Sequence, residues 1–288
     1  MHTTRREFLR VGATGLASTA LFRHHLLTYA ASKGVKFKLG VTDWNLQQEA
    51  KIGSLALAKR IGFDGVQISL GLEADRLPLG DPELQRAFLN ESSRVGLPIA
   101  SVCLNILHWH ILKSDPPAQR WVADAIPIAR KLGVKVILLP FFGRGALKTQ
   151  AEMNYVGDVL RELAPDAEKA KVILGLEDTL SARDNVRIME RSRSPAVLVY
   201  YDVGNSTNNG FDIIEEIRWL GRERICEVHL KDNPHFLGQG RINFRAVIDT
   251  LAGIGFEEWA HLETDSPTGS VEKDMKRNLA YVRELIRS

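Results

Sequence analysis

From about residue 35 onward, short apolar runs alternate with longer amphipathic stretches along the chain. The short runs are rich in Val, Ile, Leu and aromatic residues, as buried strands are. Strand candidates are residues 36–41, 63–69, 98–104, 135–140, 171–177, 196–202, 225–230 and 259–263. Strands that alternate with helical stretches indicate βα units around a parallel sheet, and eight strands close a barrel. We therefore predict an α/β fold, a single (β/α)8 TIM barrel.

The amphipathic stretches carry apolar residues at helical spacing, and several of them end in glycine. The clearest cover residues 49–62, 120–133 and 243–255, with terminal glycines at Gly62, Gly133 and Gly253 or Gly255. A glycine at this place commonly adopts the left-handed conformation that turns the chain into the next strand. No linker divides residues 32–288, so one barrel domain is expected there. A doubly wound open sheet is the alternative fold, but no glycine-rich phosphate loop, which is typical of that fold, follows the first predicted strand.

The first residues have a different pattern from the rest of the chain. Arg5 and Arg6 are followed by Phe8, Leu9 and a modestly apolar run rich in Ala and Gly. This pattern is typical of a twin-arginine export signal, and a disordered basic tail is the alternative. We predict that residues 1–31 address the protein to the twin-arginine translocation machinery and to the periplasm. If this segment is not cleaved, it would leave the protein anchored to the membrane.

Charge and cysteine content narrow the functional classes. The chain of 288 residues has a formal net charge of +3, which equals the charge of residues 1–31 alone, with four arginines and one glutamate. The remaining chain is neutral, so its charge gives no support for nucleic-acid binding. The two cysteines, Cys103 and Cys226, each fall in a strand-like run. Buried free thiols are therefore expected rather than a disulfide.

Ionisable residues end the last four predicted strands: Glu177, Asp202, His229 and Glu263. Functional groups of a TIM barrel lie at the carboxyl ends of its strands. Three carboxylates and an imidazole at one mouth would repel one another unless a cation lay among them. Mn²⁺ fits this donor set best, and Mg²⁺, Co²⁺ or Zn²⁺ fit it less well. Taken singly, each residue could instead be a helix cap, a turn former or a core histidine.

Several neighbours of these strand ends are candidates for contact with a substrate. Trp44 follows the first predicted strand and could stack on a face of the substrate or pack against a loop. Asn105, His108 and His110 follow the third strand, and one of the two histidines is expected to face the mouth. Arg241 is equally a candidate for a substrate contact and for an ordinary surface residue.

Lys231 and Asp232 come directly after the seventh predicted strand. We expect them to support the ligands, Asp232 by orienting one of them, although an ion pair at the barrel mouth is an equal alternative. His261 precedes Glu263 by two residues and should point to the same side of its strand. Its expected role is structural.

Five ordered segments carry a resemblance to a known family: "LEDT" (176–179), "YDVGN" (201–205), "EVHLKDN" (227–233), "GQGRINF" (238–244) and "HLETD" (261–265). Over roughly residues 36–286, the chain resembles the sugar phosphate isomerase/epimerase superfamily of xylose-isomerase-like barrels. The resemblance implies that Glu177, Asp202, His229 and Glu263 bind one divalent metal ion. It also implies that Glu177 and Glu263 exchange protons on opposite faces of the substrate.

Three positions depart from the pattern of the ketose epimerases in that superfamily. Arg183 stands where they carry a second glutamate, Asn205 where they carry a histidine, and His235 where they carry an arginine. The resemblance implies that all three face the substrate. A simple free-ketose 3-epimerase is therefore disfavoured, while the metal site is expected to be kept.

These observations favour a divalent-metal-dependent isomerase or epimerase that removes a proton next to a carbonyl. Because export would separate the protein from phosphorylated sugars, the expected substrate is an unphosphorylated sugar or cyclitol. The alternatives are a lyase or dehydratase acting on a keto-sugar or 3-keto-glycoside, and a non-catalytic sugar-binding protein. A metal-dependent endonuclease on the same barrel is disfavoured by the neutral charge and the few histidines. Homo-oligomerisation is left open.

Overall fold

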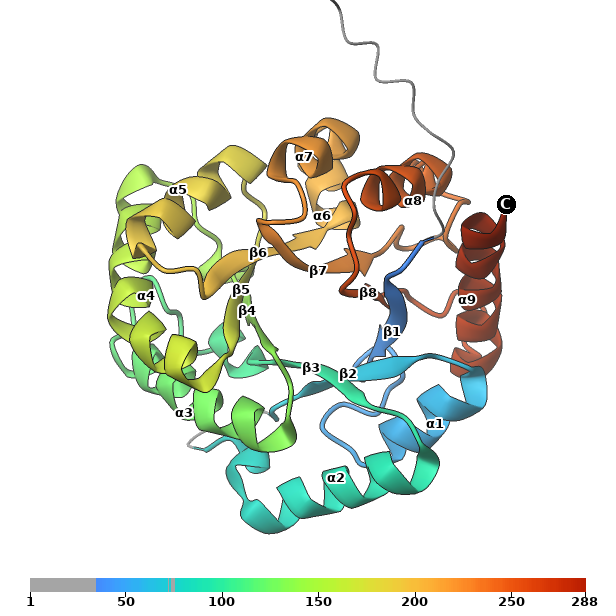
Figure 1. The fold of residues 1–288 in the computed structure, drawn as a ribbon, viewed down its shortest axis with the longest axis horizontal. Coiled ribbons are helices and arrows are strands. Elements are labelled where there is room, and N and C mark those ends of the chain that lie inside the picture. The colour runs from blue at the N-terminus through green and yellow to red at the C-terminus, as the bar shows by residue number, and fades with distance from the viewer. Residues whose placement is uncertain (1–34, 72, 74–75) are drawn as a thin grey trace, which may run out of the picture. The chain divides into compact units, whose positions relative to one another are not determined.

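The computed structural model describes residues 35–71, 73 and 76–288, and the predicted export signal lies outside these residues. Eight parallel strands form a closed barrel in which each strand pairs with the next and β8 pairs with β1 (Figure 1). The strands are β1 (Lys38–Thr42), β2 (Gly65–Ser69), β3 (Ile99–Cys103), β4 (Val136–Pro140), β5 (Ile173–Glu177), β6 (Val197–Asp202), β7 (Ile225–Leu230) and β8 (Trp259–Leu262). The predicted (β/α)8 TIM barrel is confirmed.

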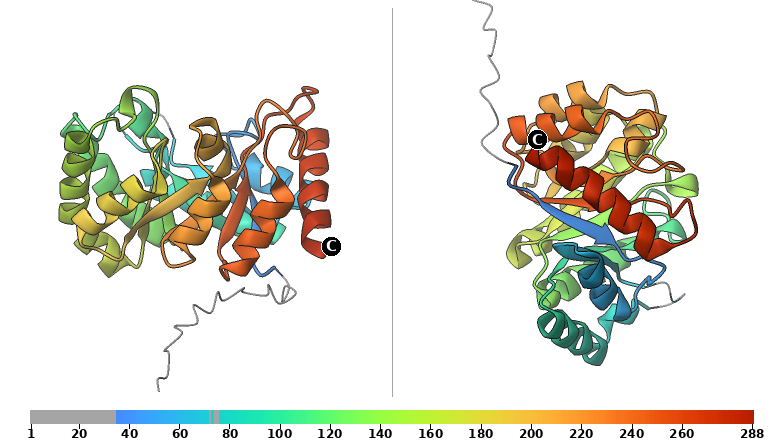
Figure 2. Two further views of the ribbon diagram at one scale, coloured as in Figure 1. Left: turned by 90° about the horizontal axis from the view of Figure 1, so that it is seen from above. Right: turned by 90° about the vertical axis from the view of Figure 1, so that its right-hand side faces the viewer.

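Helices surround the barrel on the outside, and α9 lies alongside β1 (Figure 2). The α-helices are α1 (Gly53–Ile61), α2 (Pro82–Val95), α3 (Pro117–Leu132), α4 (Gln150–Ala170), α5 (Ala182–Ser192), α6 (Val203–Asn208), α7 (Ile213–Leu220), α8 (Phe244–Gly253) and α9 (Val271–Arg287). Short 3-10 helices are η1 (Pro78–Gly80), η2 (Asn105–His108) and η3 (Gly143–Gly145). In the described residues, no helix is both long enough and apolar enough to span a bilayer.

The predicted strands agree with the observed ones to within two residues at each end. Seven observed strands lie inside their predicted ranges, and β1 extends one residue further, to Thr42. The predicted glycine ends are also found: Gly62 follows α1 and Gly133 follows α3, both with positive φ. After α8 it is Gly255 that takes the left-handed conformation, whereas Gly253 is still helical.

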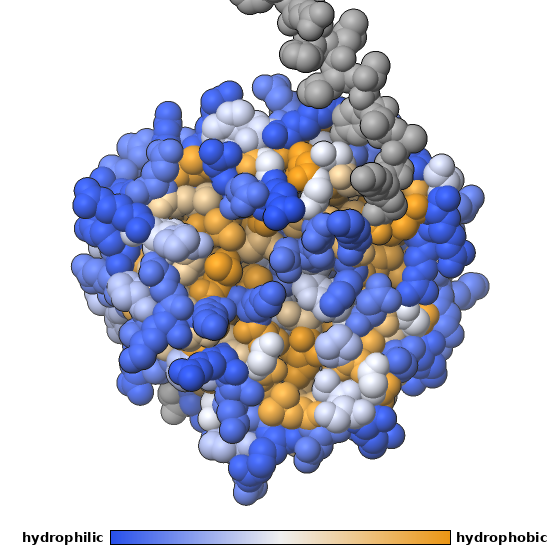
Figure 3. Space-filling view, in the orientation of Figure 1, coloured by the Kyte–Doolittle hydropathy of each residue, from blue (hydrophilic) through white to orange (hydrophobic). Residues whose placement is uncertain are grey.

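The main hydrophobic core fills the layer between the barrel and its helices, as expected when a parallel sheet is buried on both faces. A second, smaller cluster of buried apolar residues comprises Cys103, Val136, Leu138, Tyr200 and Cys226. Both cysteines are free and buried, as predicted. Figure 3 shows polar and charged side chains around the rim of one face, with apolar side chains nearer its middle.

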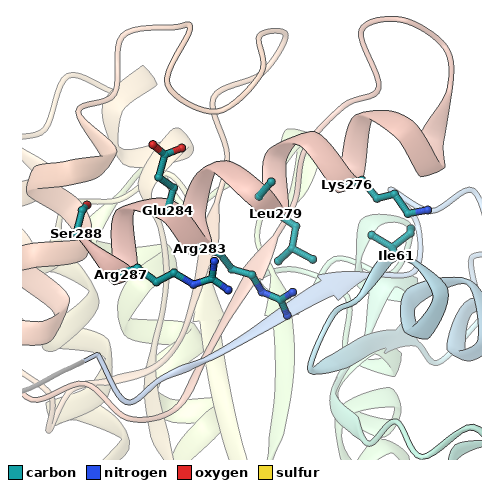
Figure 4. Close-up of a pocket in the computed structure, with 8 residues that line it drawn as sticks. Ile61, Lys276, Leu279, Arg283, Glu284, Arg287 and Ser288 are labelled. Carbon is teal, nitrogen blue, oxygen red and sulfur yellow. The ribbon is translucent and has the colours of Figure 1, made fainter.

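A groove on the helical shell lies between α9 and α1 (Figure 4). It has a volume of about 620 Å³ and is lined by charged side chains of α9, among them Lys276, Arg283 and Arg287, with Ile61 of α1 opposite. Arg283 donates to the carbonyl of Gly62. None of the residues predicted to carry the function lines this groove.

Candidate metal centre

The four predicted metal ligands meet at the carboxyl end of the barrel. Glu177 ends β5, Asp202 ends β6, His229 is the penultimate residue of β7, and Glu263 follows β8 directly. Each offers one ligand atom, and these atoms all lie within 4.8 Å of one another. Nδ1 of His229 lies 2.8 Å from Oε1 of Glu177, 3.3 Å from Oε2 of Glu263 and 3.7 Å from Oδ2 of Asp202. The strand ends therefore aim all four side chains at one point.

Two further side chains hold Glu263 in place. Nζ of Lys231 forms ion pairs with Oε2 of Glu263 and, at 2.9 Å, with Oδ2 of Asp202. Nε1 of Trp44 donates to Oε1 of Glu263 at 3.0 Å. Lys231 can reach this position because residue 204 is glycine: a Cβ there would lie 2.6 Å from Cγ of Lys231. Lys231 thus contacts two of the predicted ligands, where a residue that supports them is expected to lie.

The donor set fits a divalent cation. With His229 neutral, the three carboxylates exceed the charge of Lys231 by two units, which a divalent ion would neutralise. Carboxylate oxygens and an imidazole nitrogen are ligands that Mn²⁺ accepts readily, and Mg²⁺ prefers the oxygens. The buried cluster of Glu177, Asp202, His229 and Glu263 is thus consistent with the divalent metal site of xylose-isomerase-like barrels.

The electrostatics of the cluster reflect this excess of negative charge. Burial raises the pKa of the Glu177 carboxyl, and the nearby charges of Glu263 and Asp202 raise it further, against the opposing effect of His229. Burial alone would lower the pKa of His229, but the carboxylates of Glu177 and Glu263 outweigh it and raise that pKa. Burial would likewise raise the pKa of Glu263, yet His229 and Lys231 hold it well below its ordinary value.

Beneath the metal ligands lies a set of buried polar residues that the sequence reasoning missed. Nε2 of His229 lies 2.9 Å from Oε1 of Gln67, which belongs to β2. Nε2 of Gln67 donates to the hydroxyls of Ser101, at 3.0 Å, and Tyr200, at 3.1 Å. A signal was present in the sequence, because a glutamine inside an otherwise apolar strand must find a buried partner.

Above the ligands lies a cavity of about 410 Å³ that opens at the barrel mouth. Predicted residues on its wall are Trp44, Asn105, His108, Glu177, Asn205, Lys231 and Glu263. His110 is not on this wall, and it packs instead against Asp115 and Trp121. Of the two histidines after the third strand, it is therefore His108 that faces the mouth.

The wall also contains residues that were not singled out from the sequence. Nδ2 of Asn105 donates to Oε1 of Glu49 at 2.6 Å, and both residues line the cavity. Phe142 stacks on His108, with ring centroids 6.3 Å apart, and Trp109 lies next to them at 60% exposure. These side chains form an aromatic wall of His108, Trp109 and Phe142, whose members follow β3 and β4.

Three predicted substrate contacts lie away from this cavity. Arg183 stacks on Trp219 at 4.7 Å, outside the cavity wall. Arg241 is exposed and donates to Oδ1 of Asn208, and His235 is exposed on the loop after β7. Local partners and loop paths that no motif encodes hold each side chain there, and contact of these three residues with a substrate stays a prediction.

The hydrogen-bond partners of Asp232 and His261 define the structural roles of these two residues. The carboxylate of Asp232 accepts from the backbone N–H groups of Gly240 and Arg241, so it ties the ends of a loop together rather than orienting a metal ligand. Nε2 of His261 lies 3.0 Å from Oε2 of Glu227, one layer below the metal ligands. His261 therefore shares the side of β8 from which Glu263 projects, and it is fully buried, as a structural residue would be.

Comparison with known proteins agrees with this architecture. The family model described as "Xylose isomerase-like TIM barrel" matches residues 55–285. A 2-epi-5-epi-valiolone 7-phosphate 2-epimerase from Actinoplanes sp. is 25% identical over 75% of this chain and 82% of its own. An L-ribulose-5-phosphate 3-epimerase from Escherichia coli is 27% identical over 78% of this chain and 87% of its own.

Solved structures with low sequence identity share the fold. The apo form of 3-keto-D-glucoside 4-epimerase from E. coli superposes with a TM-score of 0.71 at 16% identity, over 86% of this chain and 100% of that one. D-Psicose 3-epimerase from Clostridium cellulolyticum H10, determined with D-tagatose, gives a TM-score of 0.73 at 18% identity, over 87% and 99%. At these identities the likeness establishes the fold of the barrel.

Proposed function

The chain belongs to the xylose isomerase-like TIM barrel family, and we propose that it is a divalent-metal-dependent isomerase or epimerase of an unphosphorylated sugar or cyclitol. The observation that carries this proposal is the pair of glutamates at the cavity floor. Glu177 comes from β5 and Glu263 comes from β8, with β6 and β7 between them, and both line the cavity. Two carboxylates separated in this way can serve two sides of one substrate.

The chemistry follows from the residues around the two glutamates. When bound, a divalent ion would supply stabilisation for the negative charge that develops on a substrate oxygen as a neighbouring C–H proton leaves. One glutamate takes that proton, and the other returns a proton to the opposite face. Lys231 and the indole N–H of Trp44 fix the carboxylate of Glu263, so it needs no reorientation before it acts.

The cavity wall supports a substrate without a phosphate group. No arginine lines the cavity among the described residues, and its one lysine, Lys231, is already paired with Asp202 and Glu263. Phosphate recognition generally uses free Arg or Lys side chains or a helix N-terminus. Although the two curated relatives are named for sugar phosphates, this wall offers no free cationic side chain for such a group.

Free polar groups on the wall suit sugar hydroxyls instead. Nδ2 of Asn205 and Oδ1 of Asn105 are buried and have no hydrogen-bond partner within the described part of the chain. One is a donor and the other is an acceptor, and a hydroxyl group can satisfy either. The unsatisfied atoms cost free energy that a bound polyol would recover.

A lyase acting on a 3-keto-glycoside is the second candidate, and the aromatic wall favours it. Trp109 is 60% exposed next to the cavity, where it could stack on the ring of a leaving group. The same proton abstraction beside a ketone can break the bond to a β-oxygen, and the departing oxygen then takes up a proton. The aglycone leaves as an alcohol, and the sugar keeps a carbon–carbon double bond.

The two reactions can be separated in heavy water. Purified full-length protein loaded with Mn²⁺ is incubated with unphosphorylated ketoses and with 3-keto-glycosides, and the products are analysed by mass spectrometry. Deuterium in recovered sugar supports the isomerase or epimerase, whereas release of the aglycone supports the lyase. If neither occurs and the purified protein binds no divalent metal, the enzymatic proposal is wrong.

The metal assignment has a narrower test in His229→Ala. Removal of the imidazole should lower the affinity for Mn²⁺ by more than about 100-fold, because even residues that only support a ligand change affinity by 10–100-fold. Titration calorimetry measures this directly. His235→Ala is a matched control, since His235 is exposed outside the cavity and should leave the affinity unchanged.

Export through the twin-arginine pathway remains a proposal that rests on the sequence of residues 1–31. The double variant Arg5→Lys, Arg6→Lys keeps the charge of the segment and removes the arginine pair. Cell fractionation should find the wild type in the periplasm and the variant in the cytoplasm. Equal distributions would contradict the proposal.

A further inference from the structure

Glu227, in the middle of β7, is buried inside the barrel one layer below His229. Its carboxylate accepts hydrogen bonds from the hydroxyl of Ser101, at 2.6 Å, and from Nε2 of His261, at 3.0 Å. The hydroxyl of Tyr200 also hydrogen-bonds to it. Because a carboxylate only accepts, each of these groups must direct its proton towards Glu227.

The orientation of the Gln67 amide follows from this arrangement. A hydroxyl carries one proton, so Ser101 and Tyr200, having given theirs to Glu227, can only accept from a further partner. Both lie within hydrogen-bonding distance of the Gln67 amide nitrogen, at 3.0 Å and 3.1 Å. The amino group of Gln67 must therefore face the two hydroxyls, and its carbonyl oxygen must face His229.

That carbonyl oxygen lies 2.9 Å from Nε2 of His229. An amide oxygen is only an acceptor, so Nε2 must carry a proton, and in the neutral ring Nδ1 then has the free lone pair. Nδ1 is the nitrogen that faces Glu177, Asp202 and Glu263. The chain of hydrogen bonds thus presents the correct nitrogen to the metal centre.

We propose that Gln67 and Glu227 are positioning residues that fix the tautomer of His229 and so raise the metal affinity of the site. This inference rests on the proposed metal-dependent function. Glu227 acts at a distance, through two hydroxyls and one amide, and it does not line the cavity. Without it, the hydroxyl protons could turn towards Gln67, and the amide would be free to flip.

The reversed orientation of the Gln67 amide explains why a carboxylate is needed at position 227. With the amide reversed, its nitrogen would face Nε2, and that ring nitrogen would have to accept. The proton would then be on Nδ1, directed at the carboxylates, where it would block metal binding. In the native arrangement this state would require Ser101 and Tyr200 to withdraw their protons from a buried carboxylate, which costs free energy.

The test uses the full-length protein, Mn²⁺ for affinity and diamagnetic Zn²⁺ for NMR. Gln67→Leu removes the acceptor for Nε2–H, and Glu227→Gln replaces the carboxylate with an isosteric amide that can also donate. We expect Gln67→Leu to raise the Kd for Mn²⁺ by about 10–100-fold and Glu227→Gln by about tenfold. In Zn²⁺-loaded, ¹⁵N-labelled wild type, we expect a slowly exchanging proton on Nε2 of His229, shifted upfield in Glu227→Gln.

A matched control separates this role from general stability. Thr250→Val removes a buried hydroxyl from α8 that bonds to the backbone carbonyl of Ala246. This variant should lose some stability and keep both the Kd and the Nε2–H resonance. A Kd change in the control as large as that in Gln67→Leu would contradict a specific role for the chain of hydrogen bonds.

The outcomes distinguish this inference from the proposed function. If the wild type binds neither Mn²⁺ nor Zn²⁺, the metal-dependent function itself fails. If the wild type binds metal but the observed ring proton is on Nδ1, the positioning role is wrong. The same holds if a folded Gln67→Leu or, should that variant not fold, a folded Glu227→Gln binds Mn²⁺ within about threefold of the wild type.

Discussion

Two layers inside the barrel contain the same residue types in opposite order. Strand β7 carries Glu227 below His229, and β8 carries His261 below Glu263. The upper layer, which we call the metal layer, consists of Glu177, Asp202, His229, Lys231 and Glu263. The lower layer consists of Ser101, Tyr200, Glu227 and His261, and Gln67 connects the two. Each layer therefore contains a histidine paired with a carboxylate from the neighbouring strand.

The layers differ in the balance of donors and acceptors. In the lower layer one carboxylate has three donors, and burial lowers the pKa of His261, which favours a neutral ring. In the metal layer three carboxylates face one imidazole and one ammonium group, and the pKa of His229 is raised although burial opposes this. Burial of polar groups is common to both layers, but three carboxylates converge only in the metal layer.

The groove along α9 extends the comparison to the surface. It is larger than the cavity at the mouth, about 620 Å³ against about 410 Å³. Two of its cations are already engaged, since Lys276 pairs with Glu272 and Arg283 donates to the carbonyl of Gly62. An excess of converging charge, rather than the volume of a depression, therefore marks the functional region.

The largest expected effect comes from neutralising a carboxylate of the metal layer. Glu263→Gln should lower turnover, measured as deuterium incorporation, by about a thousandfold, within the range for loss of a general acid or base. Glu257→Gln is the matched control, because Glu257 is an exposed residue that pairs with Lys36 on the surface, and turnover of this variant should be unchanged. A Glu263→Gln variant that stays within tenfold of the wild type would show that this carboxylate transfers no proton.

Another buried carboxylate, Asp43, outside both layers, makes the stability of the protein depend on pH. It accepts from the backbone of Ala50 and from the backbone and hydroxyl of Ser69, and burial raises its pKa from 3.8 to about 7. Between these values only the folded state binds this proton, so the stabilisation is complete below about pH 4 and is lost as the pH rises to about 7. The loss amounts to up to about 4 kcal/mol.

Asp43→Asn should remove this decline, because an amide does not titrate. Its oxygen can accept from the two backbone N–H groups, and its nitrogen can donate to the Ser69 hydroxyl in place of the bond that Asp43 accepts. Urea unfolding at several values between about pH 4 and pH 8 gives the free energy of unfolding of both proteins. Other raised groups, such as Asp178 with a pKa of about 6, affect both curves equally. If the free energy of unfolding changes with pH in the same way in the wild type and the variant, Asp43 is ionised over this whole pH range.

A smaller effect is expected from breaking the lower layer at its histidine. His261→Leu removes one of the three donors to Glu227, and the free energy of unfolding should fall by about 3 kcal/mol. The Kd for Mn²⁺ should change by less than about threefold, because the two hydroxyls still bind Glu227. His235→Leu, at an exposed position, should change neither quantity. If His261→Leu abolishes metal binding in a folded protein, the division into two layers is wrong.

The smallest effect is expected in the groove along α9. Lys276→Ala removes an exposed pair with Glu272, and exposed pairs of this kind contribute little to stability because solvent screens them. Thermal unfolding should shift by about a degree or two, and turnover should be unchanged. A large loss of turnover would mean that the groove, rather than the mouth, carries the function.

Much of the barrel could be predicted from the sequence, and the reason is visible in β5 to β8. Each of these strands is an apolar run that is followed by an ionisable residue. Neighbouring residues in the sequence therefore encode both the strand and its candidate functional end. Glu177, Asp202, His229 and Glu263 were identified in this way, and the structure brings them together. Asn205 and His108 were also placed correctly on the cavity wall.

The lower layer could not be predicted, because it depends on which way each residue of a strand points. Pairing shifts in register between Val66 and Gln67 and between Val199 and Tyr200, which breaks the simple alternation of faces at both residues. The position of Arg183 could not be predicted for a different reason. Its partner, Trp219, lies on α7, and only the folded chain shows that the two side chains stack.

Gln67 also has a consequence for proton movement. Hydroxyls, imidazoles and carboxylates can pass a proton along a chain, but an amide cannot do so without adopting its unfavourable imidic form. Gln67 lies between His229 and the groups around Glu227. It therefore connects the two layers by hydrogen bonds but prevents the transfer of a proton from one layer to the other. In the proposed reaction, a proton taken from a substrate by Glu177 or Glu263 would therefore return to the substrate or leave through the open mouth.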